Sequence, residues 1–245
     1  MFIFAIIKYM AELIEDIFLR NKLNVFEDRN EAGLLLAEKL IKYKSSDAIV
    51  FGIPSGGVPV ASEVANTLNL PMDLIIVRKI QIPYNPEAGF GAIGPGGEII
   101  LNERLLNQLS LTEDEIKTQI KKTMDVIKKR NQLFRGEKPF PNLKDKIALV
   151  VDDGLASGYT MLAAVKFIKR KIPQKIIVAV PTGSDRTVSF ILQEIDELIC
   201  LNVRSRFPFA VADAYKKWYD LSDKEVLDII KAVSKNSRTR GGFRK

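Results

Sequence analysis

Two neighbouring carboxylates, Asp152 and Asp153, follow the apolar run Ile147–Val151 and precede the glycine-rich turn Gly154–Gly158. A buried strand that turns through small residues into a helix directs several backbone N–H groups at one point, which suits a phosphate. The two acids cannot bind that same phosphate because like charges repel, so we expect them to bind hydroxyl groups or a metal ion beside it. A ribose 5-phosphate offers both partners, with a dianion at one end and a cis-diol at the other.

A second strand with a similar ending lies earlier in the chain. The apolar run Ala48–Ile53 leads through Pro54–Gly57 into a helix expected at Val58–Leu68. On its own, this pattern is equally typical of an ordinary strand–helix turn. Arg78 and Lys79 end the next expected strand. They either neutralise an anion held where the strands end or are charges that face solvent.

The run Val150–Thr160 resembles the signature loop of the type I phosphoribosyltransferases. In that family the two acids hold the ribose hydroxyls of 5-phosphoribosyl-1-pyrophosphate (PRPP), and the loop after them binds the 5-phosphate. The resemblance implies that Asp152 and Asp153 act on the ribose and, indirectly, on a Mg²⁺ cofactor. It also implies a 5-phosphate site formed by Gly154, Leu155, Ala156, Ser157, Gly158 and Thr160.

The run Phe51–Ala61 resembles the pyrophosphate loop of the same family, which often contains a cis peptide bond that would here join Pro54 to Ser55. Relatives commonly carry arginine or lysine where this chain has Ser55, so one counter-charge for the pyrophosphate is missing. The residues implied to bind pyrophosphate are Ser55, Gly56, Gly57, Arg78 and Lys79. The resemblance covers roughly Val25–Ala232 and is closest to uncharacterised members that share Ile-Pro-x-Gly-Gly and Val-Asp-Asp-Gly-Leu-Ala.

The family implies transfer of the phosphoribosyl group to a nitrogen acceptor, expected to be a nucleobase, with release of pyrophosphate. Hypoxanthine-type relatives have an acid where this chain has Ala156, which argues against an oxopurine acceptor. The acceptor would lie under a small C-terminal hood, Arg204–Tyr219. Its aromatic residues either stack on a flat ring or cover the last strand, with Trp218 in the core. They are Phe207, Phe209, Tyr215 and Trp218, together with Tyr219.

A different function remains open at this point. The same fold serves regulatory proteins that sense PRPP without catalysis. Ser55 and the absence of an acid in the phosphate loop favour such a protein. In this alternative, the basic tail of the chain contacts RNA. A kinase-type phosphate binder is disfavoured because neither Gly-x-x-x-x-Gly-Lys-[Ser/Thr] nor Gly-x-Gly-x-x-Gly follows a strand.

The elements that must position these residues alternate along the chain. Continuous apolar runs predict strands buried on both faces, hence an α/β fold with a doubly wound, mostly parallel sheet, in which ligands bind at the carboxyl ends of the strands. The expected strands are Ala48–Ile53, Asp73–Arg78, Ile147–Asp152, Lys175–Val180 and Glu197–Asn202. The expected helices are Asp28–Tyr43, Val58–Leu68, Thr160–Lys171 and Ser184–Glu194.

Two segments depart from this alternation. Residues 81–97, rich in glycine and proline, predict a long loop that serves as a lid over the site. The capping box Thr112-x-x-Glu115 then opens a charged helix. Its expected apolar stripe is Ile116, Ile120, Met124, Ile127 and Phe134. Its other face carries solvated charges at Lys121, Lys122, Lys128, Lys129 and Arg130.

Composition narrows the chemistry and the partners. The 245 residues include no histidine and one cysteine, Cys200, which we expect to be buried, so Ser-His schemes, histidine ligands and disulfides are excluded. Five of the seven net positive charges lie in residues 235–245, which we expect to be a disordered tail, and the nearly neutral body argues against a nucleic-acid partner.

The remaining expectations concern the ends and the assembly. Residues 1–24 open with seven apolar residues before Lys8, too few to cross a membrane, and predict an N-terminal helical extension. Residues 25–234 would form the transferase domain. No basic region precedes the apolar run as a secretory signal requires, so we expect a cytoplasmic protein. The family resemblance adds a homodimer as one expected assembly.

Overall fold

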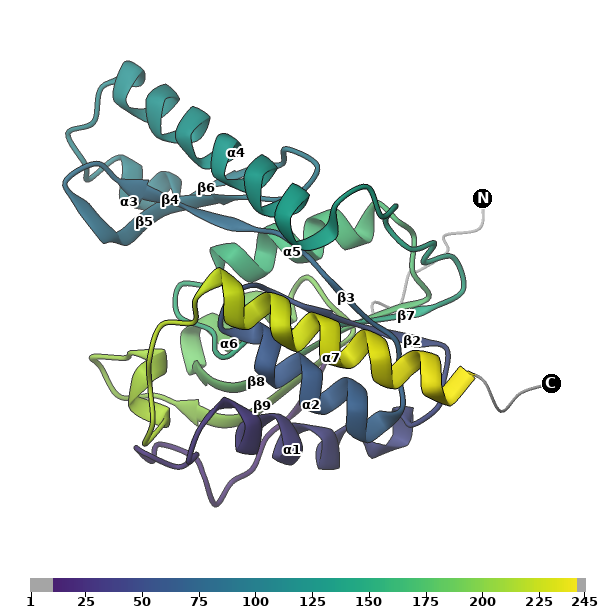
Figure 1. Ribbon diagram of the computed structural model, residues 1–245. Helices are drawn as coiled ribbons and strands as arrows, with labels where there is room; N and C mark the ends of the chain where they lie inside the picture. Colours follow the sequence, from purple (N-terminus) through teal and green to yellow (C-terminus); the bar gives the residue numbers. More distant parts are fainter. Residues whose placement is uncertain (1–10, 242–245) are drawn as a thin grey trace, which may run out of the picture.

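The computed structural model describes residues 11–241, and its centre is a six-stranded sheet in the order β1-β9-β8-β7-β2-β3 (Figure 1). Every pairing in this sheet is parallel. Its strands are β1 (Glu12–Ile14), β2 (Ala48–Gly52), β3 (Met72–Leu74), β7 (Ile147–Val151), β8 (Lys175–Ser184) and β9 (Glu197–Arg204). The predicted doubly wound parallel sheet is confirmed, although β3 ends at Leu74, short of the expected Arg78.

Helices cover both faces of this sheet because successive side chains of each buried strand point to opposite sides. On β2, Val50 packs under α1 (Arg29–Lys39) and α2 (Gly57–Leu68). Phe51 packs on the other face, under α5 (Tyr159–Lys169) and α6 (Asp185–Leu192), in the same cluster as the fully buried Cys200. Each fully buried side chain of this size stabilises the fold by about 1.5–3 kcal/mol.

A second, smaller sheet replaces the long loop predicted at residues 81–97, so the prediction of a loop is wrong, while the role of this segment as a lid stays a prediction. Antiparallel strands β4 (Arg78–Ile82), β5 (Asn85–Ile93) and β6 (Ile99–Leu101) form it, with α3 (Glu103–Leu106) at one end. The glycines that suggested a loop serve close strand contact instead: a Cβ at Gly91 would collide with the carbonyl oxygen of Ile100. In Figure 1 this sheet projects from the main one.

Helix α4 (Glu113–Arg135) covers the small sheet, and the predicted capping box at Thr112 and Glu115 is confirmed at its start. Ile127 and Phe134 are buried against β4 and β5, in a hydrophobic cluster separate from the two that cover the main sheet. Met124 is 39% exposed, so its predicted place in the buried apolar stripe is wrong.

Both predictions for the chain ends need correction where the structure describes them. Residues 12–14 form β1, not a helix, because pairing with Glu197–Ile199 satisfies the otherwise open edge of β9. Helix α7 (Asp223–Gly241) packs on α2 through Val226 and continues to residue 241, so residues 235–241 are helical rather than disordered, since an established helix extends cooperatively. The rest of both predictions falls on residues 1–10 and 242–245, outside the described part. Among the described residues, we find no helix with the length and apolar character that crossing a bilayer requires.

The amino ends of the strands carry a buried ionic cluster that joins segments far apart along the chain. The Glu197 carboxylate accepts hydrogen bonds from Lys175 Nζ at 2.6 Å and from Tyr43 Oη at 2.6 Å, and Lys42 Nζ lies 3.0 Å away. Burial opposes ionisation of Glu197, but these donors outweigh it and lower its pKa. Tyr43 itself belongs to the short 3-10 turn Ile41–Tyr43, which follows α1.

Candidate active site

The two acids predicted to bind the ribose lie at the carboxyl end of β7, directly against the glycines that follow β2. A Cβ added at Gly56 would collide with the carboxylate of Asp153, and one added at Gly57 would lie 2.8 Å from Cα of Asp152. Strands β2 and β7 are neighbours in register, so their ends meet at one edge of the sheet. The structure therefore brings together the two loops that the sequence predicted separately.

Arg29, which the sequence analysis did not single out, is the counter-ion of Asp153. Its Nε donates to Asp153 Oδ2 at 2.9 Å, its Nη1 donates to the carbonyl oxygen of Tyr219 at 2.9 Å, and the residue is 6% exposed. The guanidinium carbon lies 3.8 Å from the ring centroid of Trp218. Arg29 is the first residue of α1, whose Asp28 cap fixes the helix start.

The two carboxyl groups differ in how easily they ionise. Burial, followed by the negative charge of Asp153, raises the pKa of Asp152 well above its usual value. Burial also raises the pKa of Asp153, but Arg29 opposes this shift. Asp152 is therefore the carboxyl that retains a proton more readily in the free protein, and a cation that arrives beside the pair would favour its ionised form.

The predicted phosphate loop is fixed in place by β8 and α6. The N–H of Leu155 donates to the carbonyl oxygen of Thr182 at 2.9 Å, and Thr187 Oγ1 donates to the carbonyl oxygen of Ala156 at 2.6 Å. Leu155 is fully buried in the core, so its amide and side chain are structural, and its predicted contact with phosphate is wrong. Ala156 and Ser157 form the exposed part of the loop.

Gly158 allows the loop to turn into α5. Its φ is +82°, a left-handed conformation that favours glycine, and a Cβ there would lie 2.7 Å from Cγ2 of Thr187. Thr160 stands in the first turn of α5. The first N–H groups of a helix have no intrahelical partner, and no side chain caps this helix, so they are left to bind an anion beside the loop.

The loop after β2 offers fewer free N–H groups at its helix start: the N–H of Val58 donates to the carbonyl oxygen of Ser55 at 3.1 Å, and Pro59 has no N–H. Helix α2 begins at Gly57 without a side-chain cap, whereas side chains cap the helices α1, α3, α4 and α6. The peptide bond between Pro54 and Ser55 is cis, as the sequence predicted. The N–H of Gly57 donates to the carbonyl oxygen of Ile53 at 3.0 Å, so Gly57 serves the site through its lack of a side chain rather than through its amide.

The predicted cations Arg78 and Lys79 begin β4 and point to opposite faces of the small sheet, because side chains alternate along a strand. The stem of Lys79 lies against Gly89 of β5, where a Cβ would collide with it. Burial, and then the charge of Arg130 on α4, lower the pKa of Arg78. Arg130 thus stands beside Arg78, and its Nη2 donates to Ser55 Oγ at 3.0 Å. The prediction that Arg130 is a solvated charge is wrong, since its side chain is 15% exposed.

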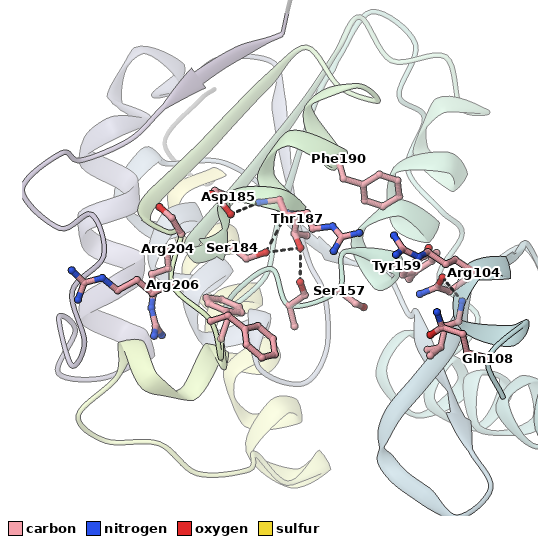
Figure 2. Close-up of a pocket in the computed structure, with 17 residues that line it drawn as sticks. Arg104, Gln108, Ser157, Tyr159, Ser184, Asp185, Thr187, Phe190, Arg204 and Arg206 are labelled. Carbon is pink, nitrogen blue, oxygen red and sulfur yellow. Dashed lines mark hydrogen bonds between the residues drawn. The ribbon is translucent and has the colours of Figure 1, made fainter.

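A cavity of about 860 Å³ opens from the phosphate loop toward the hood (Figure 2). Phe207 and Phe209 line it with Ser157, whereas Tyr215 and Trp218 do not. Tyr215 is buried, and its hydroxyl donates to the carbonyl oxygen of Asp153 at 2.7 Å. Two of the four predicted acceptor residues therefore support the acid pair instead, and Trp218 stacks on Arg29 rather than in the core.

Arginines stand on both sides of this cavity. Figure 2 shows Arg104 beside Gln108 on one side, with Arg204 and Arg206 on the other. Arg204 is paired with Asp213 at 3.1 Å, so its charge is already balanced. The cavity is thus polar at its sides and aromatic toward the hood, a lining that suits a flat polar ring.

Comparison with known proteins agrees with this geometry. The profile of the phosphoribosyl transferase domain family matches residues 28–216. The chain belongs to this family. It is 34% identical over 221 residues to the "Putative phosphoribosyl transferase" of two Mycobacterium tuberculosis strains, which covers 90% of this chain and 50% of the relative. The chain thus spans about half the length of the curated relatives it matches.

The fold of this phosphoribosyl transferase domain is also found in a solved structure. The crystal structure of the protein TT1426 from Thermus thermophilus matches with a TM-score of 0.67 and 35% sequence identity. The match covers 84% of this chain and 97% of that one. The type I phosphoribosyltransferase fold suggested by two short motifs is therefore confirmed across most of the chain.

The acid pair of this phosphoribosyl transferase domain suits a Mg²⁺ ion that would take most of its ligands from elsewhere. Asp153 Oδ2 is already bound to Arg29, and Asp152 Oδ1 accepts the N–H of Asp153 at 2.9 Å. No cluster of three metal-binding side chains exists among residues 11–241. Mg²⁺ commonly binds through one or two carboxylates, substrate phosphates and waters, and these two residues suit that arrangement.

Two residues of the transferase site escaped the sequence analysis for different reasons. Arg29 is 124 residues from Asp153, and no motif links them. The only signal was its place directly after the helix cap Asp28. Arg130 was visible in the sequence, but the four lysines near it on the same helix made it look like one more exposed charge.

Proposed function

We propose that this chain binds PRPP with Mg²⁺ and transfers the phosphoribosyl group to a nitrogen acceptor, with release of pyrophosphate. The observation that carries this proposal is the direct contact between the two loops. Gly56 and Gly57 pack so closely against Asp152 and Asp153 that neither position has space for a side chain. The uncapped start of α5 follows the second of these loops and would offer its first N–H groups to one phosphate end of such a donor.

The proposed roles follow from what each group can offer. Asp152 and Asp153 would accept hydrogen bonds from the ribose hydroxyls and orient the metal, which would supply charge stabilisation to the leaving pyrophosphate. Arg29 favours the ionised form of Asp153 and fixes its rotamer. Ala156, Ser157 and the first turn of α5 would bind the 5-phosphate. As pyrophosphate departs, positive charge develops on the ribose, and the negative carboxylates would stabilise it.

The acceptor would lie in the cavity between the phosphate loop and the hood. Phe207 is 94% exposed and Phe209 partly so, and a bound ring would cover both. We propose a nucleobase as the acceptor class because it combines a flat ring with a nucleophilic nitrogen. The transferase domain would extend over residues 25–234.

The proposed location and assembly follow from composition and from the family resemblance. One buried cysteine in the whole sequence is consistent with a reducing compartment such as the cytoplasm. A homodimer remains the proposed assembly, and sedimentation equilibrium over a concentration range tests it directly.

The decisive test measures donor binding separately from turnover. Calorimetry with PRPP and Mg²⁺ compares the unchanged chain with Asp152→Asn/Asp153→Asn, which keeps the shape of both side chains and removes their charge. We expect affinity to fall by about 100-fold or more, because two charge-assisted contacts to the ligand are lost. Equal affinity in both chains contradicts the assignment of the acid pair.

A panel of nucleobases with labelled PRPP then tests catalysis through release of pyrophosphate. Release with at least one base supports the transferase. Tight, Asp152-dependent PRPP binding with no release from any base would instead favour a PRPP-sensing regulator.

A further inference from the structure

Arg130 is a cation of the small-sheet layer that reaches across to the loop after β2. Its Nη2 donates to Ser55 Oγ at 3.0 Å, and the same nitrogen lies 2.5 Å from Oδ1 of Asp223, the first residue of α7. Its guanidinium carbon is 5.5 Å from the ring centroid of Phe134, one turn further along α4. These contacts hold the guanidinium beside the loop and out of bulk solvent.

The charges in this corner are not balanced among themselves. Arg78 and Arg130 are close enough for the charge of Arg130 to lower the pKa of Arg78, after the larger effect of burial. Asp223 is the acid that acts on both, and its side chain is 45% exposed. Two partly buried guanidiniums thus share one half-exposed carboxylate, and the excess of positive charge among these three groups favours binding of a further anion.

The position of this charge matches the leaving group of the proposed reaction. Ser55 is adjacent to Gly56, whose missing side chain lets the loop touch Asp153, so Arg130 stands at the outer side of the loop that begins α2. An anion bound beside this loop would lie between the acid pair and this guanidinium. A serine at position 55 leaves space there that a long cationic side chain on the loop itself would fill.

We propose that Arg130 binds the pyrophosphate group of the donor, and that Asp223 holds this guanidinium in place until the donor arrives. This inference rests on the proposed function and adds a residue to it: the counter-charge comes from α4, 75 residues from the loop that it serves. Binding of the donor exchanges the Asp223 carboxylate for phosphate oxygens. The small sheet, α4 and α7 are thereby linked to occupancy of the site.

The test uses inorganic pyrophosphate with Mg²⁺ as the probe, measured by calorimetry, since this readout does not depend on turnover. We expect Arg130→Gln to weaken pyrophosphate binding about 10-fold, the scale of one charge-assisted contact. The matched control is Lys129→Gln, which removes the same charge from the neighbouring, exposed position on α4 and should change affinity less than about 2-fold.

Two further variants separate a binding role from a structural one. Asp223→Asn removes the competing carboxylate and should tighten pyrophosphate binding about 3-fold, whereas a purely structural Arg130–Asp223 pair predicts unchanged or weaker binding. Ser55→Arg combined with Arg130→Gln returns a cation to the loop and should recover most of the lost affinity.

The outcomes distinguish this inference from the function on which it rests. If the unchanged chain binds neither PRPP nor pyrophosphate, the proposed function fails and this inference fails with it. If the unchanged chain binds both, and Arg130→Gln binds pyrophosphate as tightly as Lys129→Gln does, only the role of Arg130 is overturned.

Discussion

Replacing Arg29 with methionine should destabilise the protein in a way that depends on pH. The pair that it breaks is buried, with side-chain exposures of 7% for Arg29 and 15% for Asp153. Removal of one partner from a buried pair costs about 3–5 kcal/mol, because the other charge is left without compensation. The stacking of Arg29 on Trp218 contributes a further ~0.5–1 kcal/mol.

The sign of the pH effect follows from the carboxyl group that remains. Burial already raises the pKa of Asp153, and Arg29 is the main influence that opposes this, so in Arg29→Met the pKa of Asp153 rises further. A buried carboxyl group without a counter-ion no longer destabilises the folded protein once it is protonated. The destabilisation should therefore be largest above the raised pKa and should shrink as the pH falls through it.

Urea unfolding of both chains at about pH 8 and about pH 5 measures this difference. Lys39→Met is the matched control, because Lys39 lies on the same helix and pairs with Asp16 at 3.3 Å, with exposures of 37% and 26%. That exposed pair should contribute only about 0.2–1 kcal/mol. An equal loss of stability for Arg29→Met at the two pH values, or a loss no larger than that of Lys39→Met, would refute the reasoning.

Three other substitutions test separate parts of the structure. Gly57→Ala places a methyl group 2.8 Å from backbone atoms of Val151 and Asp152, so we expect a loss of about 1–3 kcal/mol in thermal or urea unfolding together with weaker PRPP binding. Unaltered PRPP affinity in that variant would show that the loop contact is dispensable. Asp152→Asn should raise the melting temperature of the donor-free chain at about pH 8. Burial and the charge of Asp153 raise the pKa of Asp152, so the ionised side chain destabilises the folded protein as the pH rises, and the uncharged amide removes this cost. A melting temperature no higher than that of the unchanged chain would contradict this. Glu197→Gln should cost roughly 1.5–3 kcal/mol at neutral pH. Because the folded pKa of Glu197 is lowered, this cost should persist down to the unfolded pKa and shrink as the pH falls from there through the folded pKa. PRPP affinity should be unchanged, so a change in PRPP affinity would argue against a purely structural cluster.

The local parts of the site were predictable because they are contiguous in the sequence. The run from Ile147 to Thr160 contains the strand, both acids, the turn and the helix start, and in a parallel sheet such a run has one spatial arrangement. The same holds for the loop at Gly56 and for its meeting with Asp153, since neighbouring parallel strands end at one edge.

The small sheet could not be predicted from its glycines, because glycine occurs both in turns and at close contacts within strands. The glycines of residues 81–97 suggest turns, but Gly89 and Gly91 lie within strand β5. Gly89 leaves room for the side-chain stem of Lys79, and Gly91 allows the adjoining strand β6 to approach closely. The alternating residues Ile80 and Ile82, which pack under α4, were the signal for a strand. They were outweighed by the many prolines and glycines that follow.

The tail was misjudged for a related reason. Its composition, basic and free of acids, is typical of disorder. Composition does not report that Val226 and Val233 anchor the preceding helical turns to the body, and the anchored helix carries its last turns along.

The acids of this site come from one short stretch of sequence, whereas the cations beside them come from distant parts of the chain. The two acids and the start of α5 lie at the end of one strand and can be recognised in a short motif. Of the cations, Arg29 is 124 residues from Asp153, and Arg130 is 75 residues from Ser55 in the neighbouring loop. Electrostatics explains why such partners must exist, because a carboxylate held at the end of a buried strand is costly without a counter-ion. It does not explain which cation fills the role, since any element that crosses the sheet edge can supply one. A buried acid pair in a sequence therefore predicts a cation whose identity only the fold can provide, and in this chain the first turn of α1 provides it.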